Sequence, residues 1–167
     1  MYKICLIIER GFQFLKTKLL ILILKIRYGK RIIIGRNFKV RKRFDIYIGP
    51  NAKLIIGDNV FFNNDCSINC MNQIYIGNDN LFGENVRVYD HNHIFNNKKL
   101  NKNISFSVKK VIIGNNNWIG SNVTILSNSI IGDNNVIGAN TVVNEEIKND
   151  NLIKLKNNVT ISKITYK

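Results

Sequence analysis

The residues best suited to acid–base chemistry stand together in the segment RVYDHNHIF, residues 87–95. This segment holds the two histidines of the chain, His91 and His93, directly behind Asp90. Neutral imidazole can accept a proton near pH 7, and a neighbouring carboxylate can hold the ring in one tautomer. The same pattern also suits part of a metal site, or a polar corner at the end of a strand. The surrounding sequence must decide between these three interpretations.

A metal site needs more ligands than this segment supplies. Zinc sites take three or four His, Cys or carboxylate ligands, and the cysteines Cys66 and Cys70 could form only half of one. We interpret them as small core residues and expect no metal cofactor. The chain has three cysteines and no CxxC motif. That count argues against a disulfide framework and favours a reducing compartment.

The chain is strongly basic. Its 167 residues fit one domain with small appendages, and its formal net charge is +14. Such a balance suits anionic partners, including phosphorylated cofactors and acidic lipid. Nucleic acid is not an expected partner, because aromatic residues are not interleaved with the basic clusters as stacking platforms.

From residue 34 onward the sequence repeats with a period of six. In the second half an isoleucine or valine stands at positions 113, 119, 125, 131, 137 and 143, with Asn, Asp and Gly between them. A period of six fits neither a helix nor an alternating hairpin. It fits short parallel strands joined by tight corners, where Asn, Asp and Gly tolerate a left-handed backbone. Every third hexad then stacks above the first, so that a triangular prism encloses a continuous core.

Two segments depart from the repeat. Residues 1–30 predict a short amphipathic helix, which could cover the open end of the β structure, lie on an anionic membrane surface, or do both. Its apolar runs are too short to span a bilayer, and no signal-peptide cleavage site follows. The polar and basic insertion at 91–110 should leave the prism as a loop. We therefore expect a helix at 1–30, a β domain at 31–153 and a basic tail at 154–167.

These motifs resemble the hexapeptide-repeat acyltransferases, which are all-β left-handed parallel β-helices. DHNHIF, a basic loop and then VIIGNNNWIGSNVTIL are similar to the maltose and galactoside acetyltransferase branch, and most similar to O-antigen and capsular polysaccharide O-acetyltransferases. The resemblance implies an acetyl-CoA-dependent enzyme that acetylates a sugar hydroxyl of a cell-surface polysaccharide or its precursor. It also implies a cytoplasmic homotrimer with active sites between subunits. The N-terminal helix would hold this trimer peripherally at the inner membrane face.

The resemblance also assigns roles to individual residues. His91 would be the general base that deprotonates the acceptor hydroxyl as it attacks the thioester directly. His93 would orient the acceptor or share the proton, and Asp90 or a backbone carbonyl would hold the His91 ring. Asn63 matches the asparagine beside the histidine and acceptor. The residues expected to bind the acceptor or the coenzyme are Asn63, Trp118, Gly120, Ser121, Gly138, Lys154 and Lys156.

Two details complete this expected site. A backbone N–H of a neighbouring subunit, near Gly120 or Ser121, would bind the tetrahedral oxyanion. The chain departs from the many members that end with a Gly-x-Pro-Ala-Lys stretch near the adenine. Lysines of the tail, Lys154 and Lys156 among them, would have to meet the coenzyme phosphates instead.

Other functions remain open on the same fold. An N-acetyltransferase would acylate an amine of a nucleotide-amino sugar instead of a hydroxyl. A non-catalytic β-helix scaffold would need no Asp-His-x-His motif at a break in the repeat. A γ-class carbonic anhydrase needs three histidine ligands for its zinc, whereas this chain has two histidines.

Overall fold

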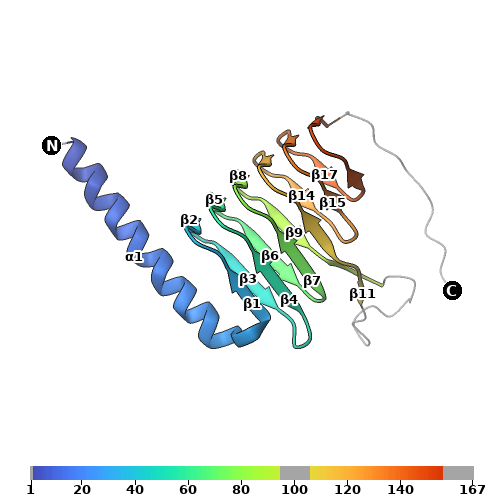
Figure 1. Ribbon diagram of the computed structural model, residues 1–167, viewed down its shortest axis with the longest axis horizontal. Coiled ribbons are helices and arrows are strands. Elements are labelled where there is room, and N and C mark those ends of the chain that lie inside the picture. The colour runs from blue at the N-terminus through green and yellow to red at the C-terminus, as the bar shows by residue number, and fades with distance from the viewer. Residues whose placement is uncertain (1, 95–105, 156–167) are drawn as a thin grey trace.

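The computed structural model describes residues 2–94 and 106–155, and shows a parallel β-solenoid with a long helix across one end (Figure 1). Each of the first five turns contributes one strand to each of three parallel sheets, which we name A, B and C, and the last turn adds strands to A and B. The turns bury an unbroken core between the sheets. This architecture confirms the predicted parallel β-helix and is consistent with the left-handed helix of hexapeptide repeats.

The strands of each sheet follow one another in the order of the turns. Sheet A contains β1 (Ile32–Ile34), β4 (Lys53–Ile56), β7 (Gln73–Ile76), β12 (Val111–Ile113), β15 (Ile130–Ile131) and β18 (Glu146–Ile147). Sheet B contains β2 (Lys39–Val40), β5 (Phe61–Phe62), β8 (Leu81–Phe82), β13 (Trp118–Ile119), β16 (Val136–Ile137) and β19 (Leu152–Ile153). Sheet C contains β3 (Asp45–Ile48), β6 (Ser67–Cys70), β9 (Arg87–Tyr89), β14 (Thr124–Ile125) and β17 (Val142–Val143).

The two-residue slips in the repeat have a structural reason. In the first turns several strands of sheets A and C are four residues long and alternate exposed with buried side chains, so each buries two residues instead of one. Strand β3 buries Ile46 and Ile48, and β7 buries Ile74 and Ile76. In the last turns the strands shorten to two residues, and the period of six becomes unbroken.

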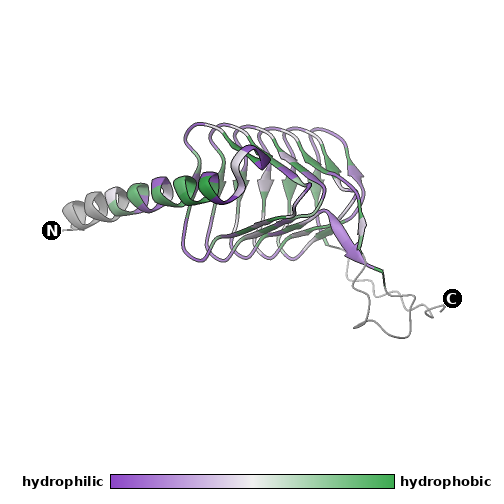
Figure 2. Ribbon diagram, turned by 90° about the horizontal axis from the view of Figure 1, so that it is seen from below, coloured by the Kyte–Doolittle hydropathy of each residue, from purple (hydrophilic) through white to green (hydrophobic). Residues whose placement is uncertain are grey.

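The corners of the solenoid are built on asparagine and aspartate. Of the described non-glycine residues with positive φ, all but Arg43 are Asn or Asp, and they stack in ladders from turn to turn. Asn116 Nδ2 donates to Asn134 Oδ1 at 2.9 Å, and Asn134 Nδ2 donates to Asp150 Oδ1 at 3.0 Å. Hydrophilic residues accordingly mark the corners, while hydrophobic residues follow the strands (Figure 2).

The repeat glycines serve close approach between turns rather than a left-handed backbone. A Cβ on Gly77 would lie 2.6 Å from both Asn115 Oδ1 and the Gly114 carbonyl oxygen of the next turn. That asparagine oxygen also accepts the Asn78 N–H at 2.8 Å, so it cannot easily move aside. Glycine follows isoleucine in the Ile-Gly pairs because neighbouring turns stack too closely to leave room for a Cβ.

The Gly77→Ala variant should lose about 1–3 kcal/mol of unfolding free energy, because the added methyl forces neighbouring turns apart. Urea unfolding followed by circular dichroism measures this loss. Gly11→Ala is the matched control, since nothing lies within 4 Å of the Cβ there and alanine favours a helix. Equal stability of parent and Gly77→Ala would show that the turns can yield at this corner.

The N-terminal helix α1 (Tyr2–Tyr28) covers the open end of the solenoid. Each turn donates its strand N–H groups to carbonyls of the next turn, as Lys39 does to Val60 O at 3.0 Å. Strand carbonyls of the first turn therefore need donors from elsewhere. Gln13 Nε2 donates to Val40 O, and the Tyr28 hydroxyl donates to Ile46 O at 2.8 Å. The helix thus protects an edge that would otherwise be open to pairing.

Residues 2–155 contain, in the parts that the structure describes, no helix long and apolar enough to cross a membrane.

Candidate active site

The Asp-His-x-His motif lies where sheet C ends and the chain leaves the solenoid. Strand β10 (His91–His93) pairs antiparallel with β11 (Phe106–Val108), so the predicted insertion begins and ends as a hairpin. Residues 95–105 of the predicted loop lie outside the described residues. After β11 the chain re-enters the solenoid at β12, which pairs with β7 of the turn before.

Asp90 anchors this corner from inside the protein. Its side chain is fully buried, and its carboxylate accepts the backbone N–H groups of Met71 and Asn72, each at 2.7 Å. The Cys70 thiol donates to Oδ2 at 3.5 Å. Three hydrogen-bond donors thus fix the carboxylate in one orientation before any contact with a histidine.

The backbone of Asp90 is held as firmly as its side chain. Its carbonyl oxygen accepts the Lys109 N–H at 2.9 Å and the Ser127 hydroxyl at 3.0 Å. Lys109 directly follows β11 near the end of the insertion, and Ser127 belongs to the next turn. The two ends of the insertion are therefore tied to each other and to the solenoid at Asp90.

His91 is the histidine that the corner orients. Its Nδ1 lies 3.4 Å from Asp90 Oδ1, a long contact, and its side chain is only 15% exposed. The Phe106 ring meets it edge to face, with 5.1 Å between centroids. Its Nε2 makes no hydrogen bond to any residue of the described ranges. A neutral ring with its proton on Nδ1 would direct an unoccupied lone pair outward.

His93 stands in a different environment. It is exposed, and its ring packs against Phe106 at 4.7 Å between centroids. No carboxylate of the described residues contacts it. Within residues 2–94 and 106–155, moreover, no group of three or more His, Cys, Asp or Glu side chains has the arrangement of a metal site.

The buried thiols are poor nucleophiles. Burial raises the pKa of Cys66 to about 11. Burial, together with the negative charge of Asp90, raises the pKa of Cys70 to about 12. Both cysteines are buried core residues and both are free. They stay protonated near neutral pH, and only the thiolate is a good nucleophile.

A second group of the predicted residues lines the corner between sheets B and C. Asn63, Gly120 and Gly138 each follow a strand of sheet B and occupy the same position in their turns, with Gly83 in the turn between Asn63 and Gly120. Lys154 continues this column after β19 and is exposed, while Lys156 lies outside the described residues. Trp118 stands on β13 with 57% of its surface exposed, so its ring faces outward as predicted.

The backbone at this corner limits where an oxyanion could bind. The Gly120 N–H already donates to Ile137 O at 2.7 Å, and the Gly138 N–H donates to Ile153 O at 2.7 Å. The Gly120 N–H is therefore not free to bind an oxyanion. A free N–H must come from the Ser121 side of the corner or from another copy of the chain.

Glu84 joins two of these predicted residues and was not among them. Its Oε1 accepts a hydrogen bond from Asn63 Nδ2, and its Oε2 accepts one from the Ser121 hydroxyl at 2.6 Å. The hydrogen bond that the Ser121 hydroxyl donates lowers the pKa of the Glu84 carboxyl below its usual range. The matching place of Glu84 and Ser121 in GEN and GSN could have indicated this contact.

The two groups do not meet within one chain. Asn63 precedes β6 and His91 follows β9, and these strands pair in register from Ser67 and Arg87 onward. The length of sheet C therefore separates them, about 13 Å for a strand of four residues such as β6. The expected closeness of Asn63 to the histidine is not present in a single copy.

Comparisons with known proteins agree with this geometry. The family "Bacterial transferase hexapeptide (six repeats)" matches residues 110–145. A hexapeptide-repeat-containing acetyltransferase from Vibrio cholerae is 28% identical with a TM-score of 0.64, and covers 71% of this chain and 66% of its own. The same Vibrio protein bound to acetyl coenzyme A gives 26% identity and a TM-score of 0.62, over 72% of this chain and 64% of that one.

Two sugar-related acetyltransferases are also similar. A maltose O-acetyltransferase from Clostridium difficile 630 is 32% identical with a TM-score of 0.60, over 70% of this chain and 62% of that one. A galactoside acetyltransferase in complex with coenzyme A is 33% identical with a TM-score of 0.50, over 60% of this chain and 52% of that one.

The chain thus spans just under two thirds of the first of these structures and less of the others. The comparison with curated protein sequences finds no match. The chain therefore carries the bacterial transferase hexapeptide repeat and shares its fold with hexapeptide-repeat acetyltransferases, including maltose and galactoside O-acetyltransferases.

Proposed function

We propose that the chain is an acetyl-CoA-dependent O-acetyltransferase that acetylates a sugar hydroxyl of a cell-surface polysaccharide or its precursor. One observation carries the proposal: His91, with Nδ1 beside the buried Asp90 carboxylate and Nε2 unoccupied by described residues, stands at the base of an insertion in a hexapeptide solenoid. The Vibrio acetyltransferase with acetyl-CoA supports the choice of co-substrate. The maltose O-acetyltransferase supports a sugar hydroxyl as acceptor.

The proposed chemistry needs one base and no covalent enzyme intermediate. His91 Nε2 takes the hydroxyl proton while the hydroxyl oxygen attacks the thioester carbonyl. The new C–O bond forms, the tetrahedral oxyanion collapses with cleavage of the C–S bond, and the imidazolium returns the proton to the departing thiolate. Asp90 stabilises the imidazolium through Nδ1–H. An acyl-cysteine route through Cys66 or Cys70 is disfavoured, because burial keeps both thiols protonated.

The complete site requires more than one copy of the chain. The histidine corner and the column of Asn63, Gly120, Gly138 and Lys154 lie at opposite ends of sheet C. We propose a homotrimer in which the histidine corner of one subunit faces the column of the next. Trp118 would contact the pantetheine arm and the acceptor there, with Ser121 beside it. Lys154 and Lys156 would meet the coenzyme phosphates.

The cellular setting belongs to the same proposal. A cytoplasmic enzyme held peripherally at the inner face of the membrane would meet lipid-linked or nucleotide-linked saccharides. No role is proposed for nucleic acid or for a metal ion. The alternatives are transfer to an amine of a nucleotide-amino sugar, which would use the same base, and a scaffold without catalysis.

The experiment is to follow thiol release from acetyl-CoA with a panel of maltose, galactosides, nucleotide sugars and nucleotide-amino sugars. We expect release above background hydrolysis with at least one hydroxyl acceptor, and a mass increase of one acetyl group on that acceptor. Transfer restricted to amino sugars would select the N-acetyltransferase. If calorimetry detects no coenzyme binding and no acceptor is acetylated, the result would favour the non-catalytic scaffold.

A further inference from the structure

Helix α1 carries two apolar stripes on opposite sides. One stripe faces the solenoid and contains buried or half-buried residues: Gln13, Thr17, Leu20, Ile21, Leu24 and Tyr28. The other contains residues that are 51–77% exposed: Phe12, Leu15, Leu19, Leu22, Ile23 and Ile26. Several outer residues follow an inner residue by two positions, as Leu19 follows Thr17. Two positions turn a helix by about 200°, which places the outer stripe away from the solenoid.

Basic side chains border the outer stripe on both edges. Lys16 and Arg27 are eleven positions apart and share one edge, while Lys18 and Lys25 are seven apart and share the other. The Lys16 ammonium lies over the Phe12 ring, 4.3 Å from its centroid, so it stays close to the apolar surface. Long lysine stems beside an apolar stripe can keep their charges at the level of lipid headgroups.

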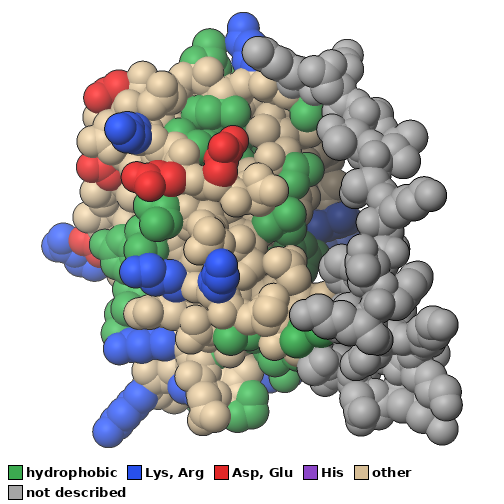
Figure 3. All heavy atoms as spheres, turned by 90° about the vertical axis from the view of Figure 1, so that its right-hand side faces the viewer, with side chains coloured by type: hydrophobic (Ala, Val, Ile, Leu, Met, Phe, Trp, Pro, Cys, Tyr) green, Lys and Arg blue, Asp and Glu red, His purple; other side chains and the backbone are tan. Residues whose placement is uncertain are grey.

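Basic residues outnumber acidic ones at the helix end of the molecule, where Glu9 is the one acidic residue of α1. Residues 11–31 contain six Lys or Arg and no Asp or Glu, and ten of the eleven acidic residues of the chain stand at position 45 or later. The face shown in Figure 3, by contrast, carries acidic and basic side chains side by side. The border of the stripe therefore complements an anionic surface.

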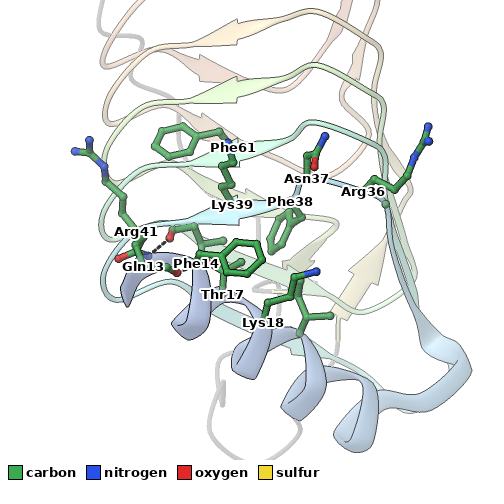
Figure 4. A pocket seen from close by; sticks show the side chains of 13 residues that line it. Gln13, Phe14, Thr17, Lys18, Arg36, Asn37, Phe38, Lys39, Arg41 and Phe61 are labelled. Carbon is green, nitrogen blue, oxygen red and sulfur yellow. Dashed lines mark hydrogen bonds between the residues drawn. The ribbon is translucent and has the colours of Figure 1, made fainter. Parts of the chain in front are cut away.

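A cavity of about 500 Å³ continues this border onto the first turn. It lies between α1 and β2, beside Lys18, and the Phe14, Phe38 and Phe61 rings line it (Figure 4). Lys39 and Arg41 stand at its rim and are exposed. Aromatic walls below a basic rim suit a phospholipid whose phosphate contacts the basic side chains and whose acyl chain enters the cavity.

We infer that α1 lies in the plane of an anionic bilayer, with the outer stripe in the acyl region and the lysine edges at the phosphates. The inner stripe keeps the solenoid attached to the helix, so the whole domain is held against the bilayer. The inference rests on the peripheral membrane association proposed above, and does not depend on acetyl transfer. A second copy of the chain could also cover the stripe, but the face that it presents to the lysine edges would have to be acidic.

The test is cosedimentation of the full chain with vesicles, measured without acetyl-CoA. We expect binding to phosphatidylcholine vesicles that contain about 30% phosphatidylglycerol, little binding to phosphatidylcholine alone, and loss of binding as salt rises from about 0.1 to 0.5 M. Leu19→Gln/Ile26→Gln should weaken binding at least about tenfold, because two apolar side chains no longer enter the bilayer. Lys16→Gln/Lys18→Gln should weaken binding to the anionic vesicles and reduce its salt dependence.

The matched control is Val142→Gln/Leu152→Gln, which removes apolar side chains 56% and 61% exposed on the far turns. It should bind vesicles as the parent does. A parent that stays in the supernatant, or a stripe variant that binds like the parent, would overturn the inference. So would a fall in oligomeric mass on substituting the stripe, since that would show a second copy covering it. Acetyl transfer can fail with vesicle binding intact, so the two proposals are tested separately.

Discussion

Replacing His91 with alanine should lower the turnover of acetyl transfer to a saccharide by at least about 10²-fold, because the attacking hydroxyl then loses its base. The KM for acetyl-CoA should change little, since we propose that the Asn63 column and Lys154, and not His91, make the contacts that bind the coenzyme. Thiol release from acetyl-CoA at saturating acceptor measures both parameters. A decrease in turnover with an unchanged KM is typical of an interaction made in the transition state.

His93→Ala is the matched control for this prediction. The two imidazoles belong to the same short strand, but only His91 lies beside the buried carboxylate. We expect the smaller loss from His93→Ala, and a larger loss there would exchange the roles of the two residues. Because His91 is partly buried, the unfolding midpoint of His91→Ala must also be measured. His91→Gln keeps more of the side-chain volume and should be equally slow.

Mixing two inactive variants tests whether the site lies between subunits. If His91 of one chain acts on a coenzyme held by the Asn63 column of another, coexpressed His91→Ala and Asn63→Ala chains should form some intact sites. The mixture would then be more active than either variant alone. An absence of recovery would place both residues in one site of one chain, against the register of sheet C.

The fold could be predicted from the sequence because each hexad repeats the same local requirement. A small or polar corner residue, a left-handed Asn or Asp and one buried aliphatic side chain recur without regard to distant parts of the chain. The exact length of each turn could not be predicted. It depends on whether a strand buries one residue or two, as β7 does with Ile74 and Ile76, and both patterns are compatible with the local sequence.

The candidate site divides in the same way. The column at Gly120 and Gly138 follows from the phase of the repeat, since equal phase places residues at one corner. The environment of Asp90 does not follow from phase. Its partners Met71 and Asn72 stand in the turn before, directly after the four-residue strand β6, and the hexad pattern alone does not predict that their N–H groups reach it. The two stripes of α1 were equally hidden, because the sequence does not say which apolar side meets the solenoid.

Asp90 is therefore the residue whose loss should affect both the fold and the chemistry. Asp90→Ala leaves the Met71 and Asn72 N–H groups without the fully buried carboxylate that accepts them, although Asn72 itself is exposed. An unsatisfied buried donor costs about 1–3 kcal/mol and a donor that water can reach costs less, so a loss of about 1–3 kcal/mol in unfolding free energy is expected. Urea unfolding measures it, and Asp45→Ala, an exposed aspartate on the same sheet, should be nearly neutral.

Asp90→Asn separates the structural role of this residue from its positioning role. The amide keeps the size of the carboxylate, but it offers one accepting oxygen where three donors now converge on two. Stability should fall less than in Asp90→Ala, because one N–H keeps its partner. Turnover should fall as well, since a neutral amide no longer stabilises the His91 imidazolium that forms as the hydroxyl attacks. If Asp90→Asn keeps full turnover while losing stability, Asp90 is an anchor of the corner alone, and a backbone carbonyl must hold the histidine ring.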